Sequence, residues 1–284
     1  MNRRTFMKAG LSAAASLAAV QMAPQIFAAD GKKVPVALEL YSLRRTAPDD
    51  VPGTLKKVAE MGYEGVEFAG TYNLQAAELR KMIDDVGLKG VSAHVGLHAI
   101  LGDNFYGTAD FYRQLGATML IVPGGLEPAI VNDAGNAMTA NLFNELAEKA
   151  KKEGFQIGFH PHTGDFRKVE GTETPAWQLF LERTSEDVIG QIDIGWCNNS
   201  GNDPAEMIAR FPGRAKIVHV KSNNNDVAGC CVADADDKVD WQKVFAACEN
   251  EGGTQWYIVE QEQFKVSELD SARECRENMK KLGR

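Results

Sequence analysis

Two of the five histidines, His160 and His162, stand two positions apart in the stretch FQIGFHPHTGDF, where a short apolar run ends. Side chains two positions apart on a strand point to the same side. Both imidazoles are therefore expected to face one pocket. An imidazole can bind a metal ion, transfer a proton or hydrogen-bond a substrate, and the neighbouring side chains decide among these roles.

Eight short runs of apolar and β-branched residues alternate with stretches of helical spacing. The runs are residues 34–41, 63–69, 88–95, 117–124, 155–160, 188–196, 215–221 and 254–262. Strands that alternate with helices predict a parallel sheet. Eight such pairs in roughly 250 residues predict an α/β fold of the closed (β/α)8, or TIM, barrel type. The first run is not followed by a GxGxxG turn, which disfavours a doubly wound open sheet.

Several helices carry recognisable start and end signals. Apolar residues recur at helical spacing over 51–61, and residues 140–154 end in lysines and a glycine. Asp203 precedes a proline and Asp240 precedes another helical stretch, so both are expected to cap helix N-termini.

Polar side chains concentrate at the predicted carboxyl ends of the strands, where TIM barrels carry their active sites. They are Glu39, Tyr41, Glu67, His94, His98, His160, His162, Asp193, Trp196, His219, Lys221, Glu260 and Glu262. All five histidines fall at or just beyond these ends. Chance placement would scatter some of them elsewhere, so the pattern predicts a catalytic barrel.

Four of these residues come one each from consecutive predicted strands: His160, Asp193, His219 and Glu260. Neighbouring strands lie about 4.8 Å apart, so the four side chains can converge on one ion. A single strand-end histidine is commonly a hydrogen-bonded pocket residue, whereas the set predicts one divalent metal ion. Two imidazoles and two carboxylates suit Mn, Fe, Co, Ni or Zn better than Mg or Ca.

The chain resembles the xylose isomerase-like barrels, the superfamily of sugar phosphate isomerases and epimerases. The resemblance is carried by LELYSLR, GYEGVEFAG, GFHPHTGDF, DIGW, GRAKIVHVKS and VDWQKVFAACENEGGTQWYIVEQE, and it covers essentially the whole mature chain. It implies a carbohydrate substrate and a divalent metal held by a glutamate, an aspartate, a histidine and a glutamate. By position these correspond to His160, Asp193, His219 and Glu260.

The first of these positions departs from the family pattern. Epimerases of the superfamily tend to carry Glu-Pro where this chain has His160-Pro161. Their strand-5 and strand-8 glutamates bind the metal and also move a proton next to a polarised carbonyl. His160 keeps a ligand but removes one carboxylate base, which places the two-glutamate mechanism in doubt.

Three residues are candidates for proton transfer: Lys221, Glu260 and His162. Lys221 follows His219 by two positions, and its pKa is expected to fall toward neutrality beside a metal; the alternative is a surface lysine. His162 is expected to act as a base or to hydrogen-bond a sugar hydroxyl.

Four residues are candidates for substrate binding: His94, Glu67, Trp196 and Tyr41. His94 is expected to bind a substrate hydroxyl, and Glu67 either to orient His94 or to form a structural ion pair. Trp196 is expected to form an apolar wall against a sugar ring or to pack in the core.

Residues 1–29 match a twin-arginine export signal, with Arg3 and Arg4 ahead of an alanine-rich apolar stretch and small residues before Asp30. The apolar stretch is too short for a stable membrane anchor, since spanning takes about 20 residues. We therefore predict a barrel over 30–284 that is exported to the periplasm.

Charge and cysteine content narrow the possible partners. Removal of Arg3, Arg4 and Lys8 with the signal takes the net charge from −8 to −11. Such an acidic chain is not expected to bind nucleic acid. Five cysteines without a CxxC pair predict no particular disulfide. A homo-oligomer is possible.

Three functions are compatible with these features. The leading one is a metal-dependent isomerase or epimerase that abstracts a proton next to the carbonyl of a keto-sugar. The His160 substitution makes a lyase or dehydratase, eliminating from a 3-keto-glycoside or an inosose, a serious alternative. A non-catalytic periplasmic sugar-binding barrel is a second alternative, disfavoured because the acid–base residues are present.

Overall fold

The computed structural model describes residues 33–223 and 227–284. The predicted export signal at 1–29 lies outside the described residues.

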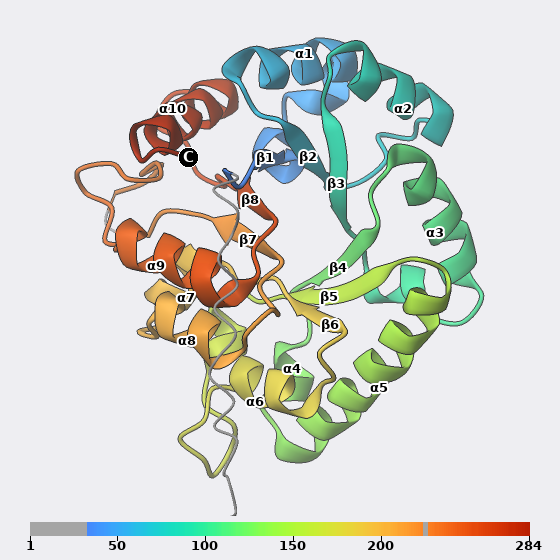
Figure 1. Cartoon of the computed structure of the whole chain (residues 1–284), viewed down its shortest axis with the longest axis vertical. Coiled ribbons are helices and arrows are strands. Elements are labelled where there is room, and N and C mark those ends of the chain that lie inside the picture. The colour runs from blue at the N-terminus through green and yellow to red at the C-terminus, as the bar shows by residue number, and fades with distance from the viewer. Residues whose placement is uncertain (1–32, 224–226) are drawn as a thin grey trace, which may run out of the picture.

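Eight parallel strands form a nearly closed barrel, as predicted (Figure 1). They are β1 Val36–Glu39, β2 Gly65–Phe68, β3 Lys89–His94, β4 Met119–Pro123, β5 Gln156–His160, β6 Val188–Gly190, β7 Ile217–Val220 and β8 Trp256–Val259. The hydrogen-bonded order is β6-β5-β4-β3-β2-β1-β8-β7, so every strand from β1 to β6 pairs with its sequence neighbour and β8 returns to β1.

The barrel closes between β6 and β7 through a few contacts. Asp193 and His219 form an isolated parallel bridge, and the amide of His219 donates to the carbonyl of Ile192 at 2.9 Å. The amide of Gly190 donates to the carbonyl of Arg214 at 3.0 Å. This closure brings two of the predicted metal ligands onto adjacent chain segments.

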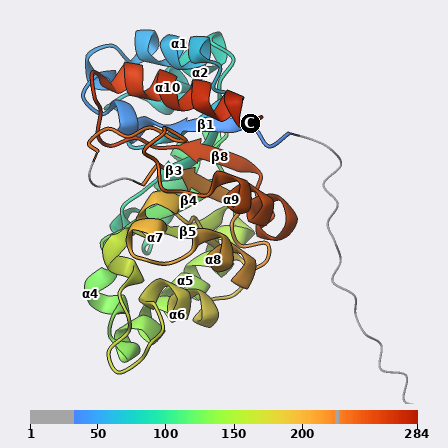
Figure 2. The ribbon, with the colours of Figure 1, turned by 90° about the vertical axis from the view of Figure 1, so that its left-hand side faces the viewer.

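Helices surround the barrel on its outside. They are α1 Val51–Met61, α2 Ala76–Asp85, α3 Asn104–Leu115, α4 Glu127–Ile130, α5 Asp133–Lys152, α6 Ala176–Arg183, α7 Ile194–Asn199, α8 Pro204–Arg210, α9 Trp241–Ala247 and α10 Glu268–Lys281. Short 3-10 turns occur at Leu40–Leu43, Ala47–Asp49, Leu97–Ile100 and Thr163–Phe166, and a π-turn at Cys248–Gly252. Figure 2 shows α1 and α10 side by side at one end of the molecule, with α5 and α6 toward the other.

The helix signals of the sequence are confirmed in three places. Helix α1 occupies 51–61 and buries its apolar face, and Asp203 and Asp240 cap α8 and α9 with their carboxylates. Helix α5 begins at Asp133, earlier than predicted, because Asn132 accepts a hydrogen bond from the amide of Gly135 at 3.1 Å.

The predicted strand 188–196 is wrong beyond Gly190. Asp193 instead caps α7, with its Oδ1 accepting from the amide of Trp196 at 2.8 Å. A side chain that satisfies a free amide at a helix start favours the helix over an extended strand.

The barrel interior contains an apolar layer below a polar one. The apolar layer consists of Ala37, Val91, Met119, Ile121, Ile189, Ile217 and Ile258. On several strands, the next inward-facing residue toward the carboxyl end is polar. Glu39 follows Ala37 in this way, and His219 follows Ile217. The apolar layer therefore supports the ionisable groups above it.

Among the described helices, none is both long enough and apolar enough to cross a membrane.

Replacement of Gly158 on β5 by alanine is predicted to destabilise the protein. A Cβ there would lie 2.5 Å from Cδ1 of Ile121 and 2.8 Å from Cβ of Ile189. Overpacking of this kind costs about 1–3 kcal/mol. We expect Gly158→Ala to lower the free energy of unfolding by that amount, measured by urea denaturation.

The matched control is Gly107→Ala, in α3, where a Cβ meets nothing within 4 Å. Alanine in a helix is favoured over glycine by about 0.8–1.0 kcal/mol, so this variant should be slightly stabilised. Equal stability of the two variants would contradict the packing described for the barrel interior.

Candidate active site

The structure brings the four predicted metal ligands together. His160 ends β5, Asp193 caps α7, His219 lies in β7 and Glu260 follows β8. One ligand atom from each lies within 4.8 Å of the others, and all four side chains are buried. His219 Nδ1 is 3.2 Å from Glu260 Oε2 and 3.9 Å from Asp193 Oδ2, and His160 Nε2 is 3.9 Å from the same Asp193 oxygen.

Three atoms of this cluster have no hydrogen-bond partner among the described residues. They are both ring nitrogens of His160 and Oδ2 of Asp193. Burying a polar group without a partner costs about 1–3 kcal/mol. These atoms face a site of mixed nitrogen and oxygen donors, which suits a first-row divalent cation. The residues present therefore fit the metal that the family pattern implies.

A second group of possible ligands overlaps the first at His219. It consists of Glu39, Glu67, His94 and His219, again within 4.8 Å of one another. Glu67 already accepts hydrogen bonds from His219 Nε2 at 2.6 Å and from the side-chain amide nitrogen of Gln191 at 2.8 Å. Gln191 Oε1 in turn accepts from His94 Nε2 at 2.8 Å. Glu39 Oε2 has no partner among the described residues, but Glu67, His219 and His94 of this second group are hydrogen-bonded. The first group has three orphaned atoms and therefore fits a metal ion better.

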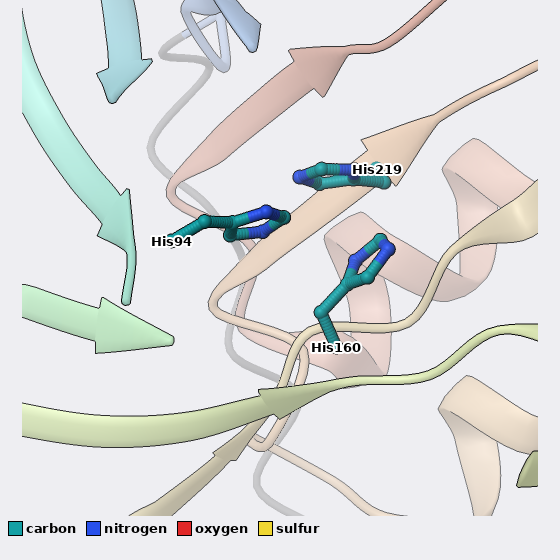
Figure 3. Close-up of side chains that lie close together, drawn as sticks. All are labelled: His94, His160 and His219. Carbon is teal, nitrogen blue, oxygen red and sulfur yellow. The ribbon is translucent and has the colours of Figure 1, made fainter. Parts of the chain in front are cut away.

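The buried His160 and His219 and the partly buried His94 lie close together (Figure 3). The ring of His94 stacks on that of His219 with centroids 5.1 Å apart, and the ring of His160 is 4.3 Å from that of His219. Burial and the neighbouring His219 and His94 hold the pKa of His160 well below its usual value. His160 is therefore neutral, as a ligand must be.

Burial and neighbouring charges act in opposite directions on the pKa of His219 and of the residues around it. Burial alone would lower the pKa of His219, but the Glu67 and Glu260 carboxylates outweigh it and raise the pKa to about 10. Burial opposes ionisation of Glu260, yet Lys221 and His219 hold its pKa well below the usual range. Burial raises the pKa of Asp193 to about 7, against the effect of Lys221.

Lys221 is buried, but the predicted fall of its pKa is wrong. Burial lowers the pKa of this ammonium, while the Glu260, Asp193 and Glu262 carboxylates outweigh burial and raise it. Its Nζ donates to Glu262 and, at 3.3 Å, to Glu260. The same ammonium lies 4.4 Å from the centroid of the Trp196 indole. Lys221 is a stable cation beside the site and is not a surface lysine.

A cavity of about 330 Å³ opens beside the ligand cluster. Its lining is Tyr41, Ala69, His94, Pro123, His160, His162, Glu260 and Glu262. His160 and His162 thus share one pocket, as their spacing predicts, with ring centroids 5.1 Å apart. Tyr41 lies at its rim and is 42% exposed.

Trp196 and Lys221 line a neighbouring cavity, which shares Glu262 with the first. Ser222, Asn223, Gln261 and Gln263 also line it. Trp196 therefore does not form the wall of the pocket that contains the histidines, although its ring centroid is 6.2 Å from that of His162.

The sequence reasoning missed Gln191, and it gave Glu39 no specific role although it counted Glu39 among the strand-end residues. Gln191 links Glu67 to His94, and Glu39 is fully buried beside Glu67. Burial and the Glu67 carboxylate raise the pKa of Glu39 well above its usual value, so Glu39 is the neutral member of the pair. Gln191 stands two positions before Asp193, a spacing that on a strand directs both side chains to the same side. This spacing was the signal in the sequence that could have identified Gln191. His98 is absent from the linings of both cavities.

The Xylose isomerase-like TIM barrel family matches residues 55–282 of the chain. The chain belongs to this family. It is 25% identical over 262 residues to an inosose dehydratase of Erwinia tasmaniensis, covering 76% of this chain and 86% of that protein. It is also 25% identical over 252 residues to the rhizopine catabolism protein MocC of Rhizobium meliloti, covering 74% of each.

Solved structures share the fold at lower identity. A sugar phosphate isomerase/epimerase from Parabacteroides distasonis superposes with a TM-score of 0.77 at 24% identity, over 88% of this chain and 98% of that one. An L-ribulose 3-epimerase superposes with a TM-score of 0.67 at 16% identity, over 87% and 94%. These likenesses show a shared fold. The family match and the curated relatives place the chain in an enzyme superfamily.

Asp193→Asn is predicted to lose metal affinity while keeping the fold. An asparagine Oδ1 can still cap α7, but the anionic Oδ2 is gone. Loss of an outer partner of a ligand costs about 10–100-fold in affinity, and we expect a loss of at least that size. Isothermal titration of chelator-treated protein with Mn²⁺, Co²⁺ and Zn²⁺ measures it.

Asp203→Asn is the matched control, since Asp203 caps α8 in the same way and contacts none of the cluster. Equal metal affinity of the two variants would contradict the ligand set.

Gly124→Ala is predicted to displace His162. Gly124 has a φ of +59°, and a Cβ there would lie 2.2 Å from His162 Nδ1. Gly125→Ala has the same kind of strain, at a φ of +75°, but its Cβ meets nothing within 4 Å. Each variant should lose about 1–2 kcal/mol through the left-handed backbone, while only Gly124→Ala should shift the imidazole resonances of His162. A shift of equal size in both variants would refute the contact.

Proposed function

We propose that the chain is a divalent-metal-dependent isomerase or epimerase acting on a keto-sugar or sugar derivative. The observation that carries the proposal is the convergence of four buried ligand residues, with orphaned atoms on His160 and Asp193, beside a cavity that contains His162 and Glu260. The family and its sugar-processing relatives support a small carbohydrate as the substrate.

We assign the metal to His160, Asp193, His219 and Glu260, with Mn, Co, Fe, Zn and Ni as candidate ions. Bound there, a divalent cation would polarise a substrate carbonyl and make the adjacent C–H acidic. Glu67 accepts a hydrogen bond from His219 Nε2, which leaves Nδ1 directed at the other ligands. A carboxylate that orients a ligand histidine in this way is a common supporting feature of metal sites.

The proton-transfer groups of the cavity are His162 and Glu260. Burial lowers the pKa of His162 from its ordinary value, so its imidazole is neutral and can accept a proton. Lys221 and His219 keep Glu260 ionised. Two bases of different chemistry therefore line one pocket, in place of two glutamates. His162 takes or returns the proton on the carbon next to the carbonyl. Lys221 remains protonated, as a donor to a substrate oxygen that extends into the adjoining cavity.

Elimination is the second candidate, favoured by the imidazole at position 160 in place of a carboxylate base. In this reaction His162 removes the proton next to the carbonyl, and Lys221 donates a proton to a departing oxygen that extends into the adjoining cavity. The inosose dehydratases among the relatives support a lyase in the same family. A non-catalytic sugar-binding barrel is the remaining alternative.

We propose separately that residues 1–29 direct export to the periplasm by the twin-arginine route. The support is the Arg3–Arg4 pair ahead of the apolar stretch.

Proton NMR in D₂O distinguishes these functions. Metal-loaded protein would be incubated with ketohexoses, 3-keto-glucosides and an inosose. Deuterium at one carbon with an intact glycosidic bond supports isomerisation or epimerisation, and release of the aglycone or of water supports elimination. A sugar that binds without any exchange or loss would overturn the enzymatic proposal.

His162→Gln should slow the reaction by about 10²–10⁴-fold, the usual contribution of a general base. His98→Gln replaces a histidine that lines neither cavity and should leave the rate unchanged. Equal rates for the two variants would remove His162 from the mechanism.

A further inference from the structure

A chain of buried hydrogen bonds connects two histidines through Glu67. His219 Nε2 lies 2.6 Å from Glu67 Oε2, and the side-chain amide nitrogen of Gln191 lies 2.8 Å from Glu67 Oε1. Gln191 Oε1 in turn lies 2.8 Å from His94 Nε2. Glu67, Gln191 and His219 are fully buried, so water does not compete for these bonds.

The direction of each bond follows from the chemistry of the groups. An ionised carboxylate only accepts hydrogen bonds, and an amide donates through nitrogen and accepts through oxygen. Glu67 has two nitrogen donors within 2.8 Å, His219 Nε2 and the side-chain amide nitrogen of Gln191, and acts as the acceptor for both. The NH₂ group of Gln191 must therefore face Glu67, and its oxygen must face His94. His94 consequently carries its hydrogen on Nε2.

This direction determines what His94 offers to the substrate. In a neutral imidazole that carries its hydrogen on Nε2, Nδ1 holds a lone pair. Nδ1 makes no hydrogen bond to the part of the chain that the structure describes, and His94 lines the cavity. The free ring nitrogen is an acceptor. It matches a hydroxyl group and is repelled by a carboxylate or a phosphate oxygen.

We propose that Gln191 is a positioning residue that holds His94 in its Nε2–H tautomer, so that Nδ1 accepts a hydrogen bond from a substrate hydroxyl. The owner of that hydroxyl, a sugar, rests on the proposed function. The tautomer does not, because the contacts of Glu67 and Gln191 determine it in the protein alone.

Glu67→Gln should reverse the direction of the hydrogen bond between Gln191 and His94. His219 still donates through Nε2, so the oxygen of the introduced amide faces His219 and its NH₂ group faces Gln191. The Gln191 amide then turns over, its NH₂ group faces His94, and the hydrogen of His94 moves to Nδ1. In the double variant Glu67→Gln/Gln191→Glu, the new amide at position 67 donates to the new carboxylate at position 191. That carboxylate accepts from His94, which restores the original direction of the His94 hydrogen bond with the same net charge.

Long-range ¹H–¹⁵N NMR of protein labelled at histidine nitrogens reads the tautomer directly, with His94→Gln to assign the signals. We expect a protonated Nε2 and a bare Nδ1 on His94 in the wild type and in the double variant, and the reverse in Glu67→Gln. A wild-type His94 with hydrogen on Nδ1 overturns the proposal, even if a variant fails to fold. An unchanged tautomer in folded Glu67→Gln also overturns it.

The catalytic consequence is measured on whichever sugar shows exchange. Glu67→Gln should lower kcat/KM by about 10–100-fold, as for other residues that orient a site histidine, and the double variant should recover most of that loss. A double variant that folds but recovers nothing contradicts a positioning role. If the tautomers behave as expected and no sugar reacts, the proposed function fails while the assignment of His94 stands.

Discussion

The imidazole of His219 has buried carboxylates on both sides, and the rest of the site depends on this arrangement. Glu67 accepts from Nε2 on one side, while Glu260 and Asp193 face Nδ1 on the other. Charges buried at the barrel axis are tolerated only when they are paired. The bridge between Asp193 and His219 also closes the barrel between β6 and β7. The same residues thus complete the fold and assemble the ligand set.

The imidazole at position 160 is consistent with the charges around it. Glu67 and Glu260 are ionised, and His219 and Lys221 are cations in the protein without a metal. A carboxylate at position 160 would add a negative charge next to Asp193, whereas a neutral imidazole adds a ligand without one. With histidine at position 160, the four candidate ligands carry a formal charge of −2, equal and opposite to that of a divalent ion. In the proposed mechanism, His162 supplies a second kind of base.

The fold was readily predicted from the sequence because the strands are short apolar runs and the helices between them carry caps and periodic faces. The ligand set followed from the rule that TIM barrels place polar residues at strand carboxyl ends. Convergence of His160, Asp193, His219 and Glu260 is a direct result of strand adjacency.

Other features depend on contacts between distant segments, which sequence spacing does not reveal. The pKa of Lys221 was predicted in the wrong direction because Glu260 and Glu262 approach it from the neighbouring β8 end. Gln191 was overlooked because an amide beside a short strand resembles a solvated side chain until its partners are known. Trp196 lies in the adjoining cavity because β6 ends at Gly190 and Asp193 then starts α7.

The central claim is that one metal ion binds to the first ligand group and none to the group around Glu39 and Glu67. A crystal structure of the metal-loaded protein, with anomalous scattering recorded at the absorption edge of the bound ion, tests it most directly. The account predicts a single anomalous peak at about 2.0–2.2 Å from the nitrogen and oxygen ligands if the ion is zinc, contributed by His160, Asp193, His219 and Glu260. A peak among Glu39, Glu67 and His94, or a fully loaded protein with no peak at His160, would contradict it.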